Sequence, residues 1–331
     1  MVAPRIDSAI QMSDGRRLAY AEYGAASGIP VLVFHGLPGS RLSWGMLPDG
    51  SLPPAARIIA PDRPGYGGSD PNPGRTLLDW ANDVEALTDS LHIGKFAVLG
   101  ISGGGPGALA CAWKMPRRLT TVGIVSSPAP TDTPGVFEGM SGTNRFFLKL
   151  AWYLPRLSNA NMRFLAAFIR RNPRRYIDTM KYKVHEADRA VLDRPEIQQM
   201  LVKDFAEAVR GGAAGMVDDM AANHGLPWGF PVEEIGSEVL LWSCELDRSV
   251  PPAMGESLSR ALPSCHLTFI KLVHTWAVDF GEGFGEVVGR RLGSGECLLS
   301  GLDRDGAVAT GGAHEFFDAP AGLGFDPVRD S

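Results

Sequence analysis

Short apolar runs recur along the first part of the chain, and segments with helical spacing separate them. Residues 17–23 alternate between apolar and polar positions, which is typical of a half-buried strand. Largely apolar runs, typical of strands covered on both faces, lie at residues 31–34, 57–60, 96–99 and 122–125. Residues 76–91 and 106–114 have the spacing of helices. This order predicts a mostly parallel sheet flanked by helices, and thus an α/β fold.

The pattern changes between about residues 136 and 228, where strand-like runs disappear and amphipathic helical segments replace them. Strand-like runs return at residues 239–242 and 266–272, with a helical pattern at 252–262 between them. The chain is therefore expected to carry a helical insertion within its α/β core.

The expected domain boundaries follow from these changes. We assign residues 1–130 and 230–292 to an α/β core, 131–229 to a helical cap and 293–331 to a poorly ordered C-terminal tail. Residues 279–292 have the pattern of a last helix. The tail is rich in Gly, Ala and Asp and has little periodicity, which is typical of a loosely attached segment.

Composition narrows the class of protein. The 331 residues are 44% hydrophobic and 21% charged, which excludes global disorder. A formal net charge of -5 argues against a nucleic-acid partner. Neither an apolar run of about 18 residues nor the apolar core of a signal peptide is visible, so no membrane span is expected. The four cysteines have no metal-binding spacing, and a cytoplasmic location is the simplest interpretation.

One charged segment stands out from this background. Residues 170–175 contain four arginines, and two interpretations are open: an anion- or membrane-binding patch, and a solvated helix end. The sequence alone favours the solvated helix end.

The segment Gly100-Ile101-Ser102-Gly103-Gly104 lies between a predicted strand and a predicted helix. A serine at such a turn is exposed at the carboxyl edge of the sheet, and the following backbone N–H groups belong to a helix N-terminus, which favours an anion. The pattern G-x-S-x-G in this setting is that of a nucleophile elbow. A phosphate-binding loop is the alternative, but the lysine of that motif is missing.

The loop His35-Gly36-Leu37-Pro38-Gly39-Ser40 follows the strand that ends at Phe34. In this topology it lies beside Ser102, so the N–H groups of Leu37 and Gly103 are candidates for an oxyanion hole. His35 is expected to support this loop through a hydrogen bond of its ring, and not to transfer a proton.

A serine nucleophile needs a base and an acid that orients the base. Among the seven histidines, His274 follows the last predicted strand at the carboxyl edge, whereas His266 begins that strand at the opposite edge. Asp247 follows the penultimate strand and is the preferred acid, with Glu245 as its rival. A purely structural role for Asp247 as a helix cap stays open.

These motifs together resemble the α/β-hydrolase fold superfamily, in its lidded, esterase-like branch. The resemblance covers roughly residues 15–275 and includes Asp62-Arg63-Pro64-Gly65-Tyr66-Gly67-Gly68-Ser69. It implies an eight-stranded sheet, a helical cap, no cofactor, and a Ser102, Asp247 and His274 triad. It also implies a structural role for Asp62.

The chain departs from the family at Lys271-Leu272-Val273-His274, where the glycine that usually precedes the catalytic histidine is missing.

The expected function is a serine hydrolase that cleaves a small-molecule ester or related acyl substrate with an apolar part. A C–C bond hydrolase, a lactonase, an acyltransferase and an inactive binding protein of the same fold stay open, as does the oligomeric state. Aromatic residues of the cap are expected to form its core or to line a pocket: Phe146, Phe147, Trp152, Tyr153 and Phe164.

Overall fold

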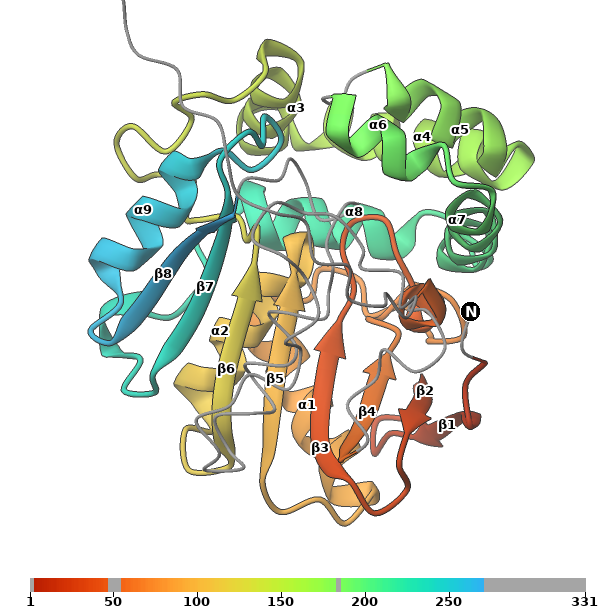
Figure 1. Ribbon diagram of the computed structural model, residues 1–331, viewed down its shortest axis with the longest axis vertical. Coiled ribbons are helices and arrows are strands. Elements are labelled where there is room, and N and C mark those ends of the chain that lie inside the picture. The colour runs from red at the N-terminus through yellow and green to blue at the C-terminus, as the bar shows by residue number, and fades with distance from the viewer. Residues whose placement is uncertain (1–2, 47–54, 183–185, 271–331) are drawn as a thin grey trace, which may run out of the picture. The chain divides into compact units, whose positions relative to one another are not determined.

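The computed structural model describes residues 3–46, 55–182 and 186–270 (Figure 1). Within these ranges, eight strands form one sheet in the order β1-β2-β4-β3-β5-β6-β7-β8. The strands are β1 (Ile6–Gln11), β2 (Arg17–Gly24), β3 (Ile29–Phe34), β4 (Ala56–Pro61), β5 (Phe96–Ile101), β6 (Leu119–Val125), β7 (Val239–Cys244) and β8 (Cys265–Ile270). β2 is antiparallel to both of its neighbours, and the other pairs are parallel. The expected eight-stranded, mostly parallel sheet is confirmed.

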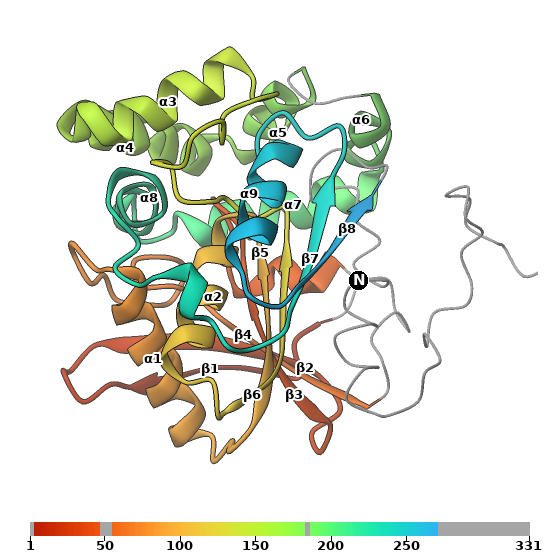
Figure 2. The same cartoon turned by 90° about the vertical axis from the view of Figure 1, so that its left-hand side faces the viewer.

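Alternate residues of the central strands point to opposite faces of the sheet. On one face, Leu32 and Val98 pack in a core with helices α1 (Leu77–Ser90), α2 (Gly105–Lys114) and α9 (Pro252–Ala261). On the other face, Val33 and Leu99 pack with Trp44 of the short helix η1 (Arg41–Met46). Figure 2 shows α1 and α2 to the left of the central strands β5 and β6. Both faces bury apolar side chains, which explains why these strands appear as continuous apolar runs in the sequence.

A helical insertion separates β6 from β7, as the sequence predicted. Its helices are α3 (Gly142–Tyr153), α4 (Pro155–Arg171), α5 (Pro173–Lys181), α6 (Glu186–Leu192), α7 (Pro195–Ala208) and α8 (Ala214–Met220). A π-helical turn, η3 (Ala221–Gly225), follows α8 directly. In both ribbon views the insertion lies beyond the carboxyl ends of the parallel strands (Figures 1 and 2). The helix expected at 279–292 and the tail expected at 293–331 lie outside the described residues, so the domain boundaries stay a prediction.

A buried carboxylate ties the insertion to the loop after β3. Asp204 of α7 accepts hydrogen bonds from the Ser40 N–H at 2.9 Å, the Ser40 hydroxyl at 2.6 Å and the Ser43 hydroxyl at 2.8 Å. Burial raises the pKa of Asp204 to about 7, although these hydrogen bonds favour the ionised form. The same loop carries Leu37, so α7 helps to fix the position of a candidate site residue.

We expect Asp204→Ala to lower the free energy of unfolding by about 3 kcal/mol, because it leaves buried donors without an acceptor. Chemical denaturation monitored by circular dichroism measures this change. The matched control is Asp178→Ala in the same insertion, where the side chain is exposed. The control should change stability by less than about 0.5 kcal/mol. Equal effects of the two substitutions would contradict the anchoring role of Asp204.

Candidate active site

Ser102 is the first residue after β5 and begins the 3-10 turn η2 (Ser102–Gly104), which leads into α2. Its φ angle is +49°, in the left-handed region that residues other than glycine rarely adopt. Such strain persists only where the surrounding structure enforces it, and it is frequent at functional sites. The structure therefore places Ser102 at the strand-to-helix turn that the sequence predicted.

The glycines on either side of Ser102 allow two backbone segments to come very close. A Cβ atom added at Gly100 would lie 2.6 Å from the carbonyl oxygen of Gly104. A Cβ atom at Gly104 would lie 2.4 Å from the carbonyl oxygen of Phe34 in β3. No side chain fits in either place, so the sharp turn requires glycine at both positions.

The loop after β3 lies against this turn. A Cβ atom added at Gly36 would lie 3.5 Å from the Cβ atom of Ser102. A Cβ atom added at Gly103 would lie 3.1 Å from Leu37 Cβ and 3.5 Å from the Leu37 backbone nitrogen. The structure thus brings together Ser102 and the two residues whose N–H groups the sequence indicated as oxyanion donors.

His35 is buried at the base of the same loop, and both of its ring nitrogens have partners. Its Nδ1 lies 2.8 Å from the Gly36 carbonyl oxygen, an acceptor, so Nδ1 carries the proton. Its Nε2 accepts a hydrogen bond of 3.2 Å from the Arg63 N–H. Burial and then the Arg63 charge hold its pKa well below the usual value. A neutral ring with both nitrogens engaged has no free position for a proton from Ser102.

Asp247 lies in the loop after β7 and is buried, whereas its rival Glu245 is exposed. One carboxylate oxygen, Oδ1, accepts hydrogen bonds from the N–H groups of Ser249 at 2.7 Å and Val250 at 3.0 Å. These bonds fix the orientation of the carboxylate at the start of the turn that leads into α9. Asp247 thus lies beyond the carboxyl end of a strand, at the same edge of the sheet as Ser102.

The candidate base His274 lies outside the described residues. In the part of the chain that the structure describes, no imidazole is hydrogen-bonded to Ser102. His266 lies near the amino end of β8, where its register partner is Leu240 and its Nε2 is 2.7 Å from Glu238 Oε1. His266 therefore occupies the edge of the sheet away from Ser102.

The comparison with protein families identifies the fold. The family model described as "alpha/beta hydrolase fold" matches residues 29–275, which is more than half of the sequence. The chain belongs to the α/β-hydrolase fold family.

Two relatives match this hydrolase-fold chain over nearly their whole length. One is a 2-hydroxymuconate semialdehyde hydrolase from Pseudomonas putida, which is 28% identical over 86% of this chain and 96% of that protein. The other is a putative 2-succinyl-6-hydroxy-2,4-cyclohexadiene-1-carboxylate synthase from Bacillus subtilis, 27% identical over 86% and 98%. A non-heme chloroperoxidase from Streptomyces lividans is 36% identical, but over only 37% of this chain and 45% of that protein.

Solved structures with the same fold include an esterase from Exiguobacterium antarcticum. It is 19% identical and has a TM-score of 0.65, with 87% of this chain and 100% of that chain covered. An enol-lactonase from Burkholderia xenovorans has a TM-score of 0.63 at 21% identity, with 86% and 100% covered. At these identities the likeness supports the fold alone.

A buried polar network of this hydrolase-fold chain joins the loop after β4 to α8. Asp219 of α8 accepts hydrogen bonds from Arg63 Nη2 at 2.7 Å and the Tyr66 hydroxyl at 2.9 Å, and it is also paired with Arg75. The two guanidinium groups hold the pKa of Asp219 below its usual value in spite of burial. Arg63 also donates to the backbone carbonyls of His35 and Gly36, so the network supports the loop beside Ser102.

Asp62 begins the turn that carries Arg63 and Tyr66. It is fully buried and accepts hydrogen bonds from the N–H groups of Arg41 at 2.6 Å and Gly68 at 2.8 Å. Burial raises its pKa to about 6, although the charge of Arg41 and these hydrogen bonds act in the opposite direction. These contacts stabilise the turn below the site.

The π-helical turn η3 brings a further residue to the nucleophile turn. Asn223 is buried, and its side-chain nitrogen Nδ2 donates a hydrogen bond of 3.0 Å to the carbonyl oxygen of Gly103. The insertion therefore contacts the same peptide segment whose N–H group is a candidate oxyanion donor. Neither Asn223 nor Asp219 was singled out from the sequence, since their partners lie more than a hundred residues away.

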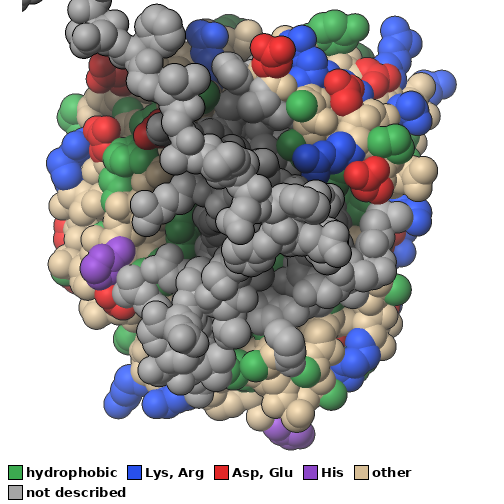
Figure 3. Space-filling view, in the orientation of Figure 1, with side chains coloured by type: hydrophobic (Ala, Val, Ile, Leu, Met, Phe, Trp, Pro, Cys, Tyr) green, Lys and Arg blue, Asp and Glu red, His purple; other side chains and the backbone are tan. Residues whose placement is uncertain are grey.

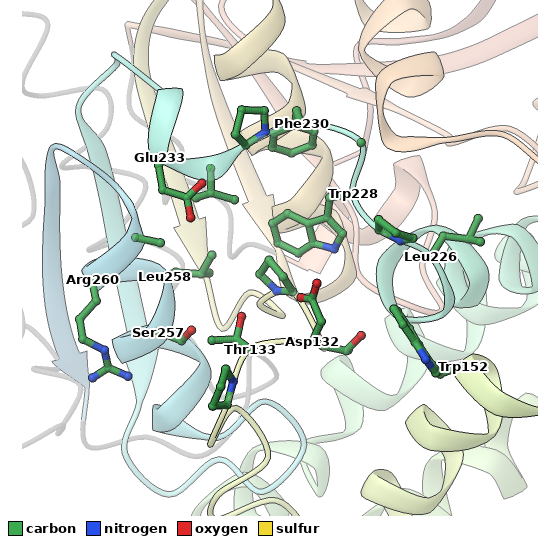
Figure 4. Close-up of a pocket in the computed structure, with 18 residues that line it drawn as sticks. Asp132, Thr133, Trp152, Leu226, Trp228, Phe230, Glu233, Ser257, Leu258 and Arg260 are labelled. Carbon is green, nitrogen blue, oxygen red and sulfur yellow. The ribbon is translucent and has the colours of Figure 1, made fainter.

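A cleft of about 780 Å³ opens elsewhere in the molecule (Figure 4). Its wall includes Trp152, Trp228 and Phe230, and Ser102 is not among its lining residues. Trp152 lines this cleft, but the expectation that the cap aromatics form walls of the substrate pocket stays a prediction. Phe146, Tyr153 and Phe164 are exposed on the surface of the insertion, so the expectation that they form the core of the cap is wrong.

His224, next to Asn223, generates a pH prediction. It is buried, its Nδ1 has no partner among the described residues, and burial lowers its pKa from 6.5 to about 4. The unfolded chain therefore binds a proton between pH 6.5 and 4 that the folded chain does not. The resulting stability is fully present above pH 6.5 and is lost as the pH falls to about 4.

Between pH 6.5 and 4 we expect the wild type to lose about 3 kcal/mol more stability than His224→Gln, since Asp62 and Asp204 titrate in both proteins. Denaturant titrations across this pH range measure it. His92→Gln, at an exposed position, serves as the matched control and should keep the wild-type dependence on pH. If His224→Gln and the wild type lost the same stability on acidification, His224 would not be the group responsible.

Proposed function

We propose that this α/β-hydrolase-fold chain is a serine hydrolase that cleaves a carboxylic ester or a related acyl compound. The observation that carries the proposal is the strained turn at Ser102, with the Leu37 loop packed against Gly103. In this proposal, Ser102 attacks the carbonyl carbon, and His274 accepts the hydroxyl proton. Asp247 orients the imidazole and stabilises its charged form.

The two backbone N–H groups of Leu37 and Gly103 then stabilise the oxyanion of the tetrahedral intermediate. His274 returns the proton to the leaving group, and the acyl group stays on Ser102. A water molecule activated by the same imidazole releases the acyl group. The side chain of Asn223 supports this arrangement, since it holds the carbonyl of Gly103 and thereby the orientation of the neighbouring peptides. His35 and Arg63 support the opposite donor loop.

The kind of bond that is cleaved has a second candidate besides the ester bond. The two relatives of nearly full length are named a semialdehyde hydrolase and a carboxylate synthase, whereas esterases occur among the structural neighbours. A C–C bond hydrolase with the same serine is therefore the second candidate. A panel of esters, lactones and substrates with a cleavable carbon–carbon bond distinguishes the two.

We expect Ser102→Ala to reduce hydrolysis of a short-chain p-nitrophenyl ester by about 10⁴-fold or more, because the nucleophile is removed. Spectrophotometric release of p-nitrophenol measures the rate. Ser90→Ala, at an exposed position at the end of α1, is the control and should keep wild-type activity. A fluorophosphonate probe should label the wild type and not Ser102→Ala. Equal ester hydrolysis by the wild type and Ser102→Ala would overturn the proposal, and absence of labelling would favour a binding protein.

The base is tested by a pair of histidine variants. We expect His274→Ala to lose activity by about 10⁴-fold, since Ser102 then lacks a proton acceptor. His266→Ala should keep the wild-type kcat, because that ring lies at the other edge of the sheet and pairs with Glu238. Steady-state kinetics on the same ester compare the two. Loss of activity in His266→Ala alone would show that the assignment of the base is wrong.

A further inference from the structure

The first three helices of the insertion carry a strong excess of positive charge. Residues 142–182 contain nine lysines and arginines and one acidic residue, Asp178, in a chain whose formal net charge is -5. The positive charge is thus concentrated in one part of the molecule, and the remainder is correspondingly acidic. In both ribbon views α3 and α4 lie on the side of the insertion that faces away from the sheet (Figures 1 and 2).

The outward side of α4 combines these cations with apolar side chains. Its buried residues, such as Met162 and Ile169, lie on the inward side. The residues on the opposite side follow helical spacing and are all exposed: Arg156, Leu157, Arg163, Phe164, Arg170 and Arg171. Phe164 is 74% exposed and Leu157 is 54% exposed. The inner side of α4 is therefore buried in the insertion, whereas its outer side carries both cations and exposed apolar side chains.

The helix before it shows the same combination. Arg145, Phe146, Lys149 and Tyr153 are exposed on α3, with Phe146 at 59% and Tyr153 at 72%. We call these residues of α3 and the six outward residues of α4 the basic–aromatic face. Figure 3 shows basic, hydrophobic and acidic side chains side by side along the upper edge of the view, where the insertion lies.

The cations of α4 on this face are not neutralised by neighbouring acids. Among the described residues, none of the four α4 arginines forms an ion pair, whereas Lys181 of α5 pairs with Asp193. Large exposed apolar side chains between unpaired cations are the composition of helices that lie at a membrane surface. The cations attract anionic headgroups, and the apolar side chains enter the boundary with the acyl chains.

A nucleic acid is the other polyanion that could attract these cations. The rings of Phe146, Tyr153 and Phe164 offer stacking surfaces to its bases, but a nucleic acid has no apolar layer to receive Leu157. A lipid surface satisfies both halves of the composition, since it provides anionic groups and an apolar layer beneath them. The sequence alone favoured a solvated helix end for residues 170–175. The exposed Leu157 and Phe164 on the same helix favour the other interpretation, a membrane-binding patch.

We propose that the basic–aromatic face binds the surface of an anionic lipid bilayer. The arginines and lysines contact the phosphate groups of the lipids, and Phe146, Leu157 and Phe164 insert between the headgroups. The contact is peripheral, and no described helix is long and apolar enough to cross a bilayer. The proposal does not depend on the chemistry at Ser102.

Co-sedimentation of the full chain with lipid vesicles tests the proposal. We expect binding to vesicles of equal parts phosphatidylcholine and phosphatidylglycerol, and no binding to phosphatidylcholine alone. Binding should weaken as salt is added, because the attraction to the headgroups is screened. Equal binding to both kinds of vesicle, or binding to neither, would overturn the proposal.

Matched variants separate this face from net charge. Arg163→Gln with Arg170→Gln should weaken partitioning by about 30-fold, since each cation near an anionic surface contributes roughly fivefold. The control is Lys95→Gln with Arg117→Gln, which removes the same charge from exposed positions that precede β5 and β6, at the edge of the sheet away from the insertion. The control should bind as the wild type does. Equal weakening in both pairs would show that net charge acts, and not this face.

The apolar contribution has its own variant and its own rival outcomes. Leu157→Ser with Phe164→Ser keeps every cation and should also reduce binding to anionic vesicles, with an unchanged circular dichroism spectrum because both side chains are exposed. Unchanged vesicle binding in this variant would contradict insertion. Tighter binding of the wild type to single-stranded RNA than to vesicles, or loss of a dimer in Arg163→Gln with Arg170→Gln, would assign the face to a different partner and overturn the proposal.

Discussion

The close approach of backbone segments at the end of β5 is the constraint on which the rest of the site depends. Gly100 and Gly104 leave room for β5, β3 and the start of α2 to meet without side chains between them. Because the chain must reverse within so few residues, Ser102 is held at a positive φ angle. The backbone of the turn therefore sets the position of the Ser102 side chain.

Buried carboxylates of the insertion fix the loops around that turn. Asp204 holds the loop after β3 through Ser40 and Ser43, and Asp219 holds Arg63, which in turn supports the carbonyls of His35 and Gly36. A buried carboxylate is costly unless several hydrogen-bond donors surround it. The loops that supply these donors to Asp204 and Asp219 are therefore held in place. The insertion is therefore part of the framework of the site, and the donor loop is positioned from both the sheet and the helices.

Much of this could be predicted from the sequence, because strands buried on both faces leave continuous apolar runs. The runs 31–34 and 96–99 lie within β3 and β5, and the G-x-S-x-G turn follows where predicted. β1 was not identified from its pattern, since Ile6–Gln11 at the sheet edge has little buried surface and no clean alternation. Asp204 and Asp219 gave no signal, because an acid that pairs with residues some 150 positions away looks like any surface acid in a helix.

The exposed aromatic residues of the insertion show a different limit of sequence reasoning. Helical spacing indicates that Leu157 and Phe164 share a face of α4, but it does not indicate whether that face is turned inward. The buried set of Met162 and Ile169 lies on the opposite side of the helix, which settles the question only once the structure is known. The same insertion then has two surfaces of different chemistry. Its inner surface holds the loops of the proposed active site, and its outer surface is basic and apolar, so lipid binding there would bring the site close to a bilayer.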